Sequence, residues 1–555
     1  MRHPAALLGA VLSLLAPESM RAQSAPSDST IRAILQARVD SGRTVGIVVG
    51  ITQNGTRRFF TAGTAGPGRA PLDEHTIFEI GSISKTFNAL LLADAVTRGE
   101  VRLDQPVAEL LPSTVKLPTH PSGPITLEHL ATHRSGLPRL PGNMMPADGN
   151  DPYADYDTTR LHAFLASHTL TRAPGAIGEY SNLGAGLLGY ALTVRAGKPS
   201  WGALVDERIT GPLAMRETHV EVPAALRARF AAAHNAAMDT VSYWRLDALA
   251  GAGALRSTAA DMLTYLEAQL QPAATPLPRA IPMSQDVRHA FGGVDSIALG
   301  WLVRTRPSSR IYWHNGGTGG FRSFAGFDPL RGIGVVVLVN AKVPPEDIGM
   351  HLLDPRLPLA MPPVPPRRTA IEVSAEVLER LVGKYALTSQ ITLTVTREGD
   401  ALYVQPSGQP KFRLWASARD RFFLREVDAQ LEFEFDAAGQ ATAVTLVQHG
   451  ARRRAVRRAE MSSLAPVRAQ RFTRSPDTSA RAIRLVQDDS ARGWRIPVVG
   501  IAIGAVAGAA LGAVYAEGQC EGTEPCGEWK TGAKGGALIG GAIGLVMELI
   551  GPSPG

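Results

Sequence analysis

The sequence predicts an α+β fold for the region up to residue 350, and three observations carry this prediction. Two apolar, β-rich runs at 45–53 and 56–63 are joined by Asn54-Gly55, which is the strongest short signal for a β-hairpin. A long helical region with many glycine and proline breaks follows. Three more strands are expected at 311–313, 322–327 and 334–339. Segregated strands and helices indicate an antiparallel sheet with helices packed on it, in which the first and last strands can pair.

Local start and stop signals place the main helices. The first begins around Ser82, directly after a glycine, and ends near Arg98-Gly99, where a basic residue precedes a glycine. Thr126 is expected to cap a helix at 125–133. Two further helices are expected at 185–196 and at 258–270, the second capped by Ser257 or Thr258.

The region after residue 350 changes character twice. Six prolines between 355 and 366 indicate a stiff linker. Apolar residues then alternate with polar ones over 370–460, as in Leu431, Phe433 and Phe435, which predicts a small antiparallel, barrel-like β domain. A polar stretch at 461–494 is expected to be a flexible tether.

The two ends of the chain carry signals for export and for membrane association. Arg2 and His3 precede an apolar run and then small residues, the pattern of a secretory signal peptide. At the other end, glycines recur every four residues in two segments, which predicts a glycine-zipper helical hairpin. We expect this hairpin to insert into a membrane or to self-associate. Its acidic loop, with Cys520 and Cys526 at a spacing that permits a disulfide, opposes the positive-inside rule and is expected on the oxidising side.

The predicted parts are a signal peptide at 1–23, an α+β domain at 24–350, a proline-rich linker at 351–369, a β domain at 370–460, a tether at 461–494 and a glycine-zipper hairpin at 495–551. The protein is therefore expected in a periplasm-like space or the cell envelope.

Composition narrows the possible chemistry. The net charge is +7, but no basic run is interleaved with aromatic residues, so nucleic-acid binding is not expected. The chain has two cysteines, both outside the α+β domain, which leaves no thiolate nucleophile or thiolate metal site there. His129 and His133 lack an evident third ligand, and we predict neither a metal nor a cofactor.

Three short motifs of the α+β domain carry candidate chemistry. Ser82 and Lys85 lie three apart at a helix start, so the amine can reach the hydroxyl and act as its base. Tyr180 can shuttle a proton, and Asn182 can donate its amide to a substrate carbonyl. His314-Asn315-Gly316-Gly317 ends a strand, where the backbone N–H of Gly317, with that of Ser82, can form an oxyanion hole.

In this order and spacing the motifs resemble those of the serine β-lactamase and penicillin-binding-protein superfamily, nearest to class C β-lactamases, D-alanyl-D-alanine carboxypeptidases and related esterases. The resemblance covers roughly residues 28–345. It implies a β-lactamase/transpeptidase-like fold with a helical subdomain. It also implies acylation of Ser82, proton transfer by Lys85 and Tyr180, and substrate contacts from Asn182, His314, Gly316 and Gly317.

The third motif departs from the usual Lys-Thr-Gly of such β-lactamases, because His314 stands in the lysine position. A histidine is a weaker, pH-dependent anchor for a carboxylate, and the pattern is closer to the esterase and peptidase branches.

The sequence leaves two hypotheses for the function. The first is an exported serine hydrolase that acts on a β-lactam, a D-amino-acid peptide or an ester. The second is a non-catalytic, penicillin-recognising sensor or envelope scaffold.

Overall fold

The computed structural model describes residues 25–458, apart from residue 43 and gaps at 361–367, 389–390, 408, 410 and 449–450. The predicted signal peptide, tether and glycine-zipper hairpin, with Cys520 and Cys526, lie outside the described residues. Between residues 25 and 458, no helix combines the length and the apolar composition that a membrane span needs.

One antiparallel sheet of eight strands underlies the first domain, in the order β2-β1-β12-β11-β10-β9-β8-β7. As predicted, Asn54 and Gly55 both have positive φ and turn β1 back onto β2, and the first and last strands, β1 and β12, pair. The strands are β1 (Gly46–Gln53), β2 (Thr56–Gly63), β7 (His289–Ala290), β8 (Asp295–Ile297), β9 (Leu302–Arg306), β10 (Ser309–Gly317), β11 (Arg322–Asp328) and β12 (Ile333–Val339).

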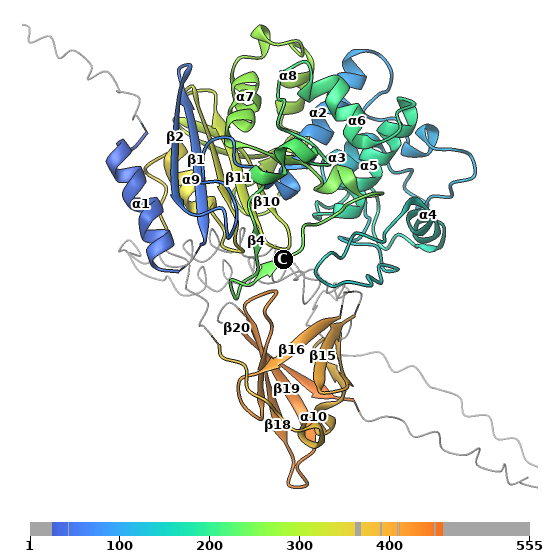
Figure 1. Cartoon of the computed structure of the whole chain (residues 1–555). Coiled ribbons are helices and arrows are strands. Elements are labelled where there is room, and N and C mark those ends of the chain that lie inside the picture. The colour runs from blue at the N-terminus through green and yellow to red at the C-terminus, as the bar shows by residue number, and fades with distance from the viewer. Residues whose placement is uncertain are drawn as a thin grey trace, which may run out of the picture.

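Helices cover both faces of this sheet, so each face has its own apolar core (Figure 1). On one face pack α1 (Asp28–Asp40) and α9 (Glu346–Leu353). On the other lie α7 (Ala259–Leu270) and the helical region, which comprises α2 (Ser84–Thr97), α3 (Leu127–Ala131), α4 (Thr158–Ser167), α5 (Asn182–Arg195), α6 (Trp201–Val205) and α8 (Ala280–Gln285). This arrangement confirms the predicted α+β class.

Helix α2 lies at the centre of this second core. Its residues from Ser84 to Ala95 are buried, because α8, α5, α3 and α6 pack around it. A single 3₁₀ turn, Gly81–Ile83, leads into it, so Ser82 lies in this turn, two residues before the α-helix begins. The helix ends at Thr97 and Gly99 has φ +73°, which is the predicted glycine stop.

The other predicted helices are present, but α3 is shorter than predicted, at Leu127–Ala131 rather than 125–133, and α5 begins earlier. Thr126 and Thr258 cap α3 and α7 as expected. Helix α5, predicted to begin at Ala185, instead begins at Asn182. The reason is that the Ser181 hydroxyl accepts a hydrogen bond from the Gly184 N–H and so caps the helix three residues earlier.

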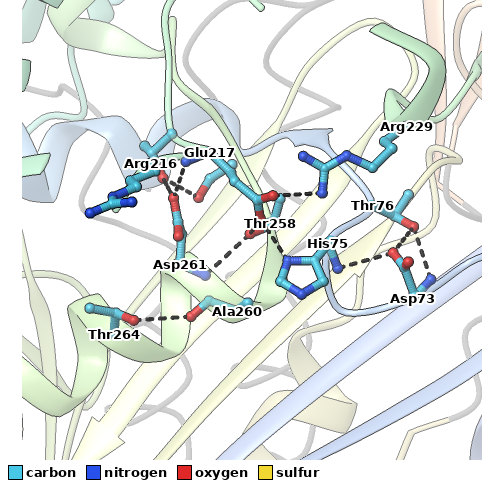
Figure 2. Close-up of polar contacts among 12 residues, drawn as sticks. Asp73, His75, Thr76, Arg216, Glu217, Arg229, Thr258, Ala260, Asp261 and Thr264 are labelled. Atoms are coloured by element: carbon cyan, nitrogen blue, oxygen red, sulfur yellow. Dashed lines mark hydrogen bonds and ion pairs between the residues drawn. The ribbon is translucent and has the colours of Figure 1, made fainter. Parts of the chain in front are cut away.

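Two short strands, β3 (Phe78–Glu79) and β6 (Arg256–Ser257), pair directly before Ser82. A polar cluster around the α7 cap braces the neighbouring chain segments (Figure 2). The Asp261 carboxylate accepts the Glu217 N–H at 2.8 Å, and the Glu217 carboxylate in turn accepts from His75 at 2.8 Å and from Arg229 at 2.6 Å. The cluster ties α7 to the segments on either side of β3 and β6.

The second domain is a closed antiparallel barrel, in agreement with the predicted barrel-like β domain. Closure by pairing of Tyr385 with Arg457 leaves the sheet without a free edge. The barrel and first domain contact each other near β4 (Ala233–His234) and β5 (Thr240–Val241), where Arg425 pairs with Asp239 at 3.2 Å (Figure 1). Its elements are α10 (Ala375–Leu381), β13 (Gly383–Ala386), β14 (Thr392–Glu398), β15 (Ala401–Pro406), β16 (Phe412–Ala416), β17 (Arg421–Phe423), β18 (Ala429–Phe435), β19 (Ala441–Gln448) and β20 (Ala451–Arg457).

Candidate active site

Ser82 and Lys85 meet as their spacing predicts. The Lys85 amine donates to the Ser82 hydroxyl at 2.9 Å and to the backbone carbonyl of Ala252 at 2.6 Å. Burial lowers the pKa of Lys85 well below its usual range, and the nearby charge of Arg139 acts in the same direction. A neutral amine has a lone pair that can take the proton of the serine hydroxyl, so Lys85 is suited to be the base.

Tyr180 lies on the other side of this pair. The Lys85 amine is 4.8 Å from the centre of the Tyr180 ring. Burial raises the pKa of Tyr180 to about 12, although the Arg139 charge and a side-chain hydrogen bond with Ser82 oppose the shift. The phenol therefore stays protonated at neutral pH. It can give a proton to a departing group and recover one through Ser82 and Lys85.

The second motif is held at a helix start rather than in extended chain. Ser181 is extended, but Asn182 is the first residue of α5, so the second motif spans the junction of a loop and a helix. The Asn182 amide nitrogen donates to the Tyr153 hydroxyl at 3.3 Å. Its amide oxygen is buried and has no hydrogen-bond partner within the described part of the chain. Asn182 thus has an unused polar atom beside the catalytic candidates.

The third motif comes to the site on β10. The rings of His314 and Tyr180 lie 6.2 Å apart, centre to centre. The Nδ1–H of His314 donates to the backbone carbonyl of Asn315 at 2.5 Å, which leaves Nε2 as an acceptor. Burial lowers the pKa of His314 to about 3, and Lys85 acts in the same direction when it is protonated. The imidazole is therefore neutral at physiological pH and carries no charge with which to anchor a carboxylate.

Two glycines of β10 allow the strand to lie directly against the turn that carries Ser82. A Cβ on Gly316 would stand 1.9 Å from the Ile80 carbonyl oxygen. A Cβ on Gly81, which has φ +50°, would stand 2.6 Å from the Gly317 nitrogen. Side chains at these positions cannot be accommodated without moving backbone. The close approach places the Gly317 peptide next to the Ser82 turn, where an oxyanion hole needs it.

Sequence reasoning missed two residues that contact the site. His133 has φ +57° and its ring centre lies 4.4 Å from that of Tyr180. Its Nδ1 accepts the Ser181 N–H at 3.2 Å, so it helps to position the second motif. The guanidinium carbon of Arg139 lies 5.1 Å from the Tyr180 ring centre. Both residues lie over forty positions before Tyr180, so only the fold reveals these contacts.

His133 and His129 do not form a pair of metal ligands. The Nδ1 of His129 accepts the Thr126 N–H at 3.3 Å, within the cap of α3, whereas His133 faces Tyr180. In the residues that the structure describes, no group of three or more His, Cys, Asp or Glu side chains is placed to hold a metal ion.

Comparisons with known proteins agree with this site. Residues 31–354 match the family described as Beta-lactamase, and residues 367–459 match a domain of unknown function, DUF3471. A beta-lactamase from Pseudomonas fluorescens is 27% identical over 352 residues, which cover 57% of this chain and 93% of that protein. The D-alanyl-D-alanine-carboxypeptidase/endopeptidase AmpH of Escherichia coli K12 is 30% identical over 320 residues, covering 54% of this chain and 80% of AmpH.

A solved structure shares the fold as well. The class C beta lactamase from Rhodobacter sphaeroides aligns with a TM-score of 0.52 at 28% identity, and the alignment covers 59% of this chain and 99% of that one. The family match spans more than half of the sequence, and the three motifs meet around Ser82. This chain therefore belongs to the Beta-lactamase family and is a serine hydrolase of that family.

Proposed function

We propose that the protein is an exported hydrolase that cleaves an ester or amide through an acyl-enzyme on Ser82. The observation that carries the proposal is the Ser82 hydroxyl, 2.9 Å from a buried Lys85 amine that itself lies 4.8 Å from the centre of the Tyr180 ring. Lys85 takes the hydroxyl proton as Ser82 attacks the substrate carbonyl, and Tyr180 protonates the leaving group. Water then attacks the ester on Ser82 as Tyr180 and Lys85 relay its proton, which releases the acid and restores the serine.

The remaining motif residues are assigned to substrate binding. The backbone N–H groups of Ser82 and Gly317 stabilise the oxyanion, and Gly316 lets the substrate lie along the edge of β10. His314 contributes its Nε2 as a hydrogen-bond acceptor rather than as a cation, which the low pKa of its buried ring supports. Asn182 contacts a substrate amide through its unpartnered oxygen or, after a flip, its nitrogen.

The substrate class is a D-amino-acid peptide, an ester or a β-lactam. The names of the relatives include both beta-lactamase and D-alanyl-D-alanine-carboxypeptidase/endopeptidase, so each supports one of these classes. The neutral third motif makes efficient β-lactam hydrolysis the least favoured. Activity on a cephalosporin, a D-Ala-D-Ala peptide and a short-chain ester distinguishes the three.

Intact-protein mass spectrometry tests the acyl-enzyme directly. Wild-type protein exposed to a labelled penicillin or a fluorophosphonate should gain one adduct on Ser82, and Ser82→Ala should gain none. Absence of an adduct with both probes contradicts the proposal. A penicillin adduct that forms but never turns over, with no activity on any of the three substrates, would instead identify the non-catalytic sensor.

A further inference from the structure

The segment before Arg139 is fastened to the second motif by its backbone. The Ser181 hydroxyl donates to the Pro138 carbonyl at 2.7 Å, and the N–H groups of Asn182 and Leu183 both donate to the Arg139 carbonyl, at 3.0 and 3.2 Å. These are the free N–H groups of the first turn of α5. The position of the Arg139 backbone is therefore coupled to that of Tyr180 and Asn182.

The Arg139 side chain lies over the catalytic candidates without an anionic partner. Its guanidinium carbon is 5.1 Å from the Tyr180 ring centre, and its charge acts on Lys85, His133 and Tyr180. It is half-buried, and within residues 25–458 as described it makes no ion pair. Neighbouring arginines differ. Arg134 donates to backbone carbonyls, and Arg172 pairs with Glu179.

Burial disfavours the charged form of the lysine and histidines at the site. Burial lowers the pKa of Lys85 and of His133 well below their usual ranges, and lowers that of His314 to about 3. Behind the third motif, the Asn315 amide donates to the Glu346 carboxyl at 2.5 Å, and burial raises the pKa of that carboxyl to about 7. The cation on the β10 side is Arg322, which is buried, donates to the Thr318 and Phe321 carbonyls and acts on the Glu346 carboxyl.

We propose that Arg139 is an anion-binding residue of the substrate site and that it takes a carboxylate of the substrate on the Tyr180 side. The guanidinium presents a planar fork of donors that matches a carboxylate. This inference rests on the proposed function for its substrate but concerns binding, so it can be tested separately from acylation. It predicts a preference for anionic over neutral ligands even though the third motif is uncharged.

A matched pair of aryl esters tests the proposal by turnover. The two substrates are the p-nitrophenyl ester of adipic acid with a free distal carboxylate and the same ester with the distal carboxylate methylated. Wild-type protein should show the lower KM for the free carboxylate. Arg139→Gln should raise that KM by about tenfold to a hundredfold, the range for a lost charge-assisted contact, and should remove the difference between the two esters. Arg139→Lys should restore part of the preference, because it keeps the charge but not the fork.

A control and a binding measurement complete the test. Arg102→Gln removes the same charge from an exposed surface pair with Asp104 and should leave the ester preference unchanged.

Calorimetry with Ser82→Ala measures binding of both esters without acylation, so the result does not depend on the proposed nucleophile. On that background the free carboxylate should bind about tenfold or more tightly, and adding Arg139→Gln should abolish the difference. Equal binding of the two esters, or equal losses for both on mutation of Arg139, would overturn the inference.

Discussion

Gly81 allows a direct test of how closely β10 approaches the nucleophile. Gly81→Ala places a methyl group at φ +50°, which strains an L-residue by about 1–2 kcal/mol. The new Cβ would also stand 2.6 Å from the Gly317 nitrogen and 2.9 Å from its oxygen. Because backbone atoms cannot rotate away, β10 and the Ser82 turn must separate by roughly 0.5–1 Å, at a further cost of about 1–3 kcal/mol.

Gly99→Ala is the matched control at the other end of the same helix. Gly99 has φ +73°, but a Cβ there would meet nothing within 4 Å. We expect Gly99→Ala to lose only the strain of about 1–2 kcal/mol, and Gly81→Ala to lose roughly 2–5 kcal/mol in total, both measured by urea unfolding.

The activity of the two variants should differ more than their stability. A displacement approaching 1 Å at the reacting atoms costs about a hundredfold in rate, so Gly81→Ala should lower kcat/KM for a neutral ester by about that factor. Gly99→Ala should retain wild-type kcat/KM. The reasoning is refuted if the two variants unfold at the same urea concentration and react equally fast with the fluorophosphonate.

Three further predictions concern the base, the polar cluster and the barrel. Since Lys85 must be neutral to accept a proton, kcat/KM should fall as the pH drops through its lowered pKa, and Lys85→Arg should abolish adduct formation at every pH where the protein is folded. The hydrogen bond with Glu217 raises the pKa of His75, so its contribution to stability is complete below the unfolded value of about 6.5 and is lost as the pH rises through the folded value. His75→Gln should therefore lower Tm at about pH 6 more than at about pH 8, and an equal effect at both would exclude the linkage. Phe433 is 5% exposed in the barrel core, so Phe433→Ala should cost the barrel about 3–5 kcal/mol while leaving Ser82 labelling intact in the folded protein, and loss of labelling would show that the two domains depend on each other.

The parts of the fold that follow local rules could be predicted from the sequence. Asn54-Gly55 defines a hairpin because both residues tolerate positive φ, and Gly99 ends α2 for the same reason. The contact of Ser82 with Lys85 follows from helical spacing alone. The start of α5 was predicted three residues late. Glycines just after Ser181 disfavour a helix, but the cap that Ser181 provides lets the helix begin there.

The missing parts of the site depend on long-range contacts. His133 and Arg139 reach Tyr180 only because the backbone before α5 hydrogen-bonds to the segment after α3. No local pattern in a single sequence contains that pairing. The charge state of His314 could not be predicted from the sequence either, because a histidine ring can be charged or neutral near physiological pH. Burial, with Lys85 close by, lowers the pKa of the ring and decides for the neutral form, although the bond to the Asn315 carbonyl favours the charged one.

The same burial explains where positive charge can exist in this site. Helix α2 is buried, and that burial lowers the pKa of Lys85, which favours the neutral amine that can act as a base. His314, packed 6.2 Å from Tyr180 in the same core, is neutral for the same reason. A permanent cation costs least where solvent still reaches it, and a guanidinium is the side chain that stays protonated there. The half-buried Arg139, held by its own carbonyl to α5, meets both conditions. A site with a buried base can therefore recognise an anion from its rim, and Arg139 lies at that boundary.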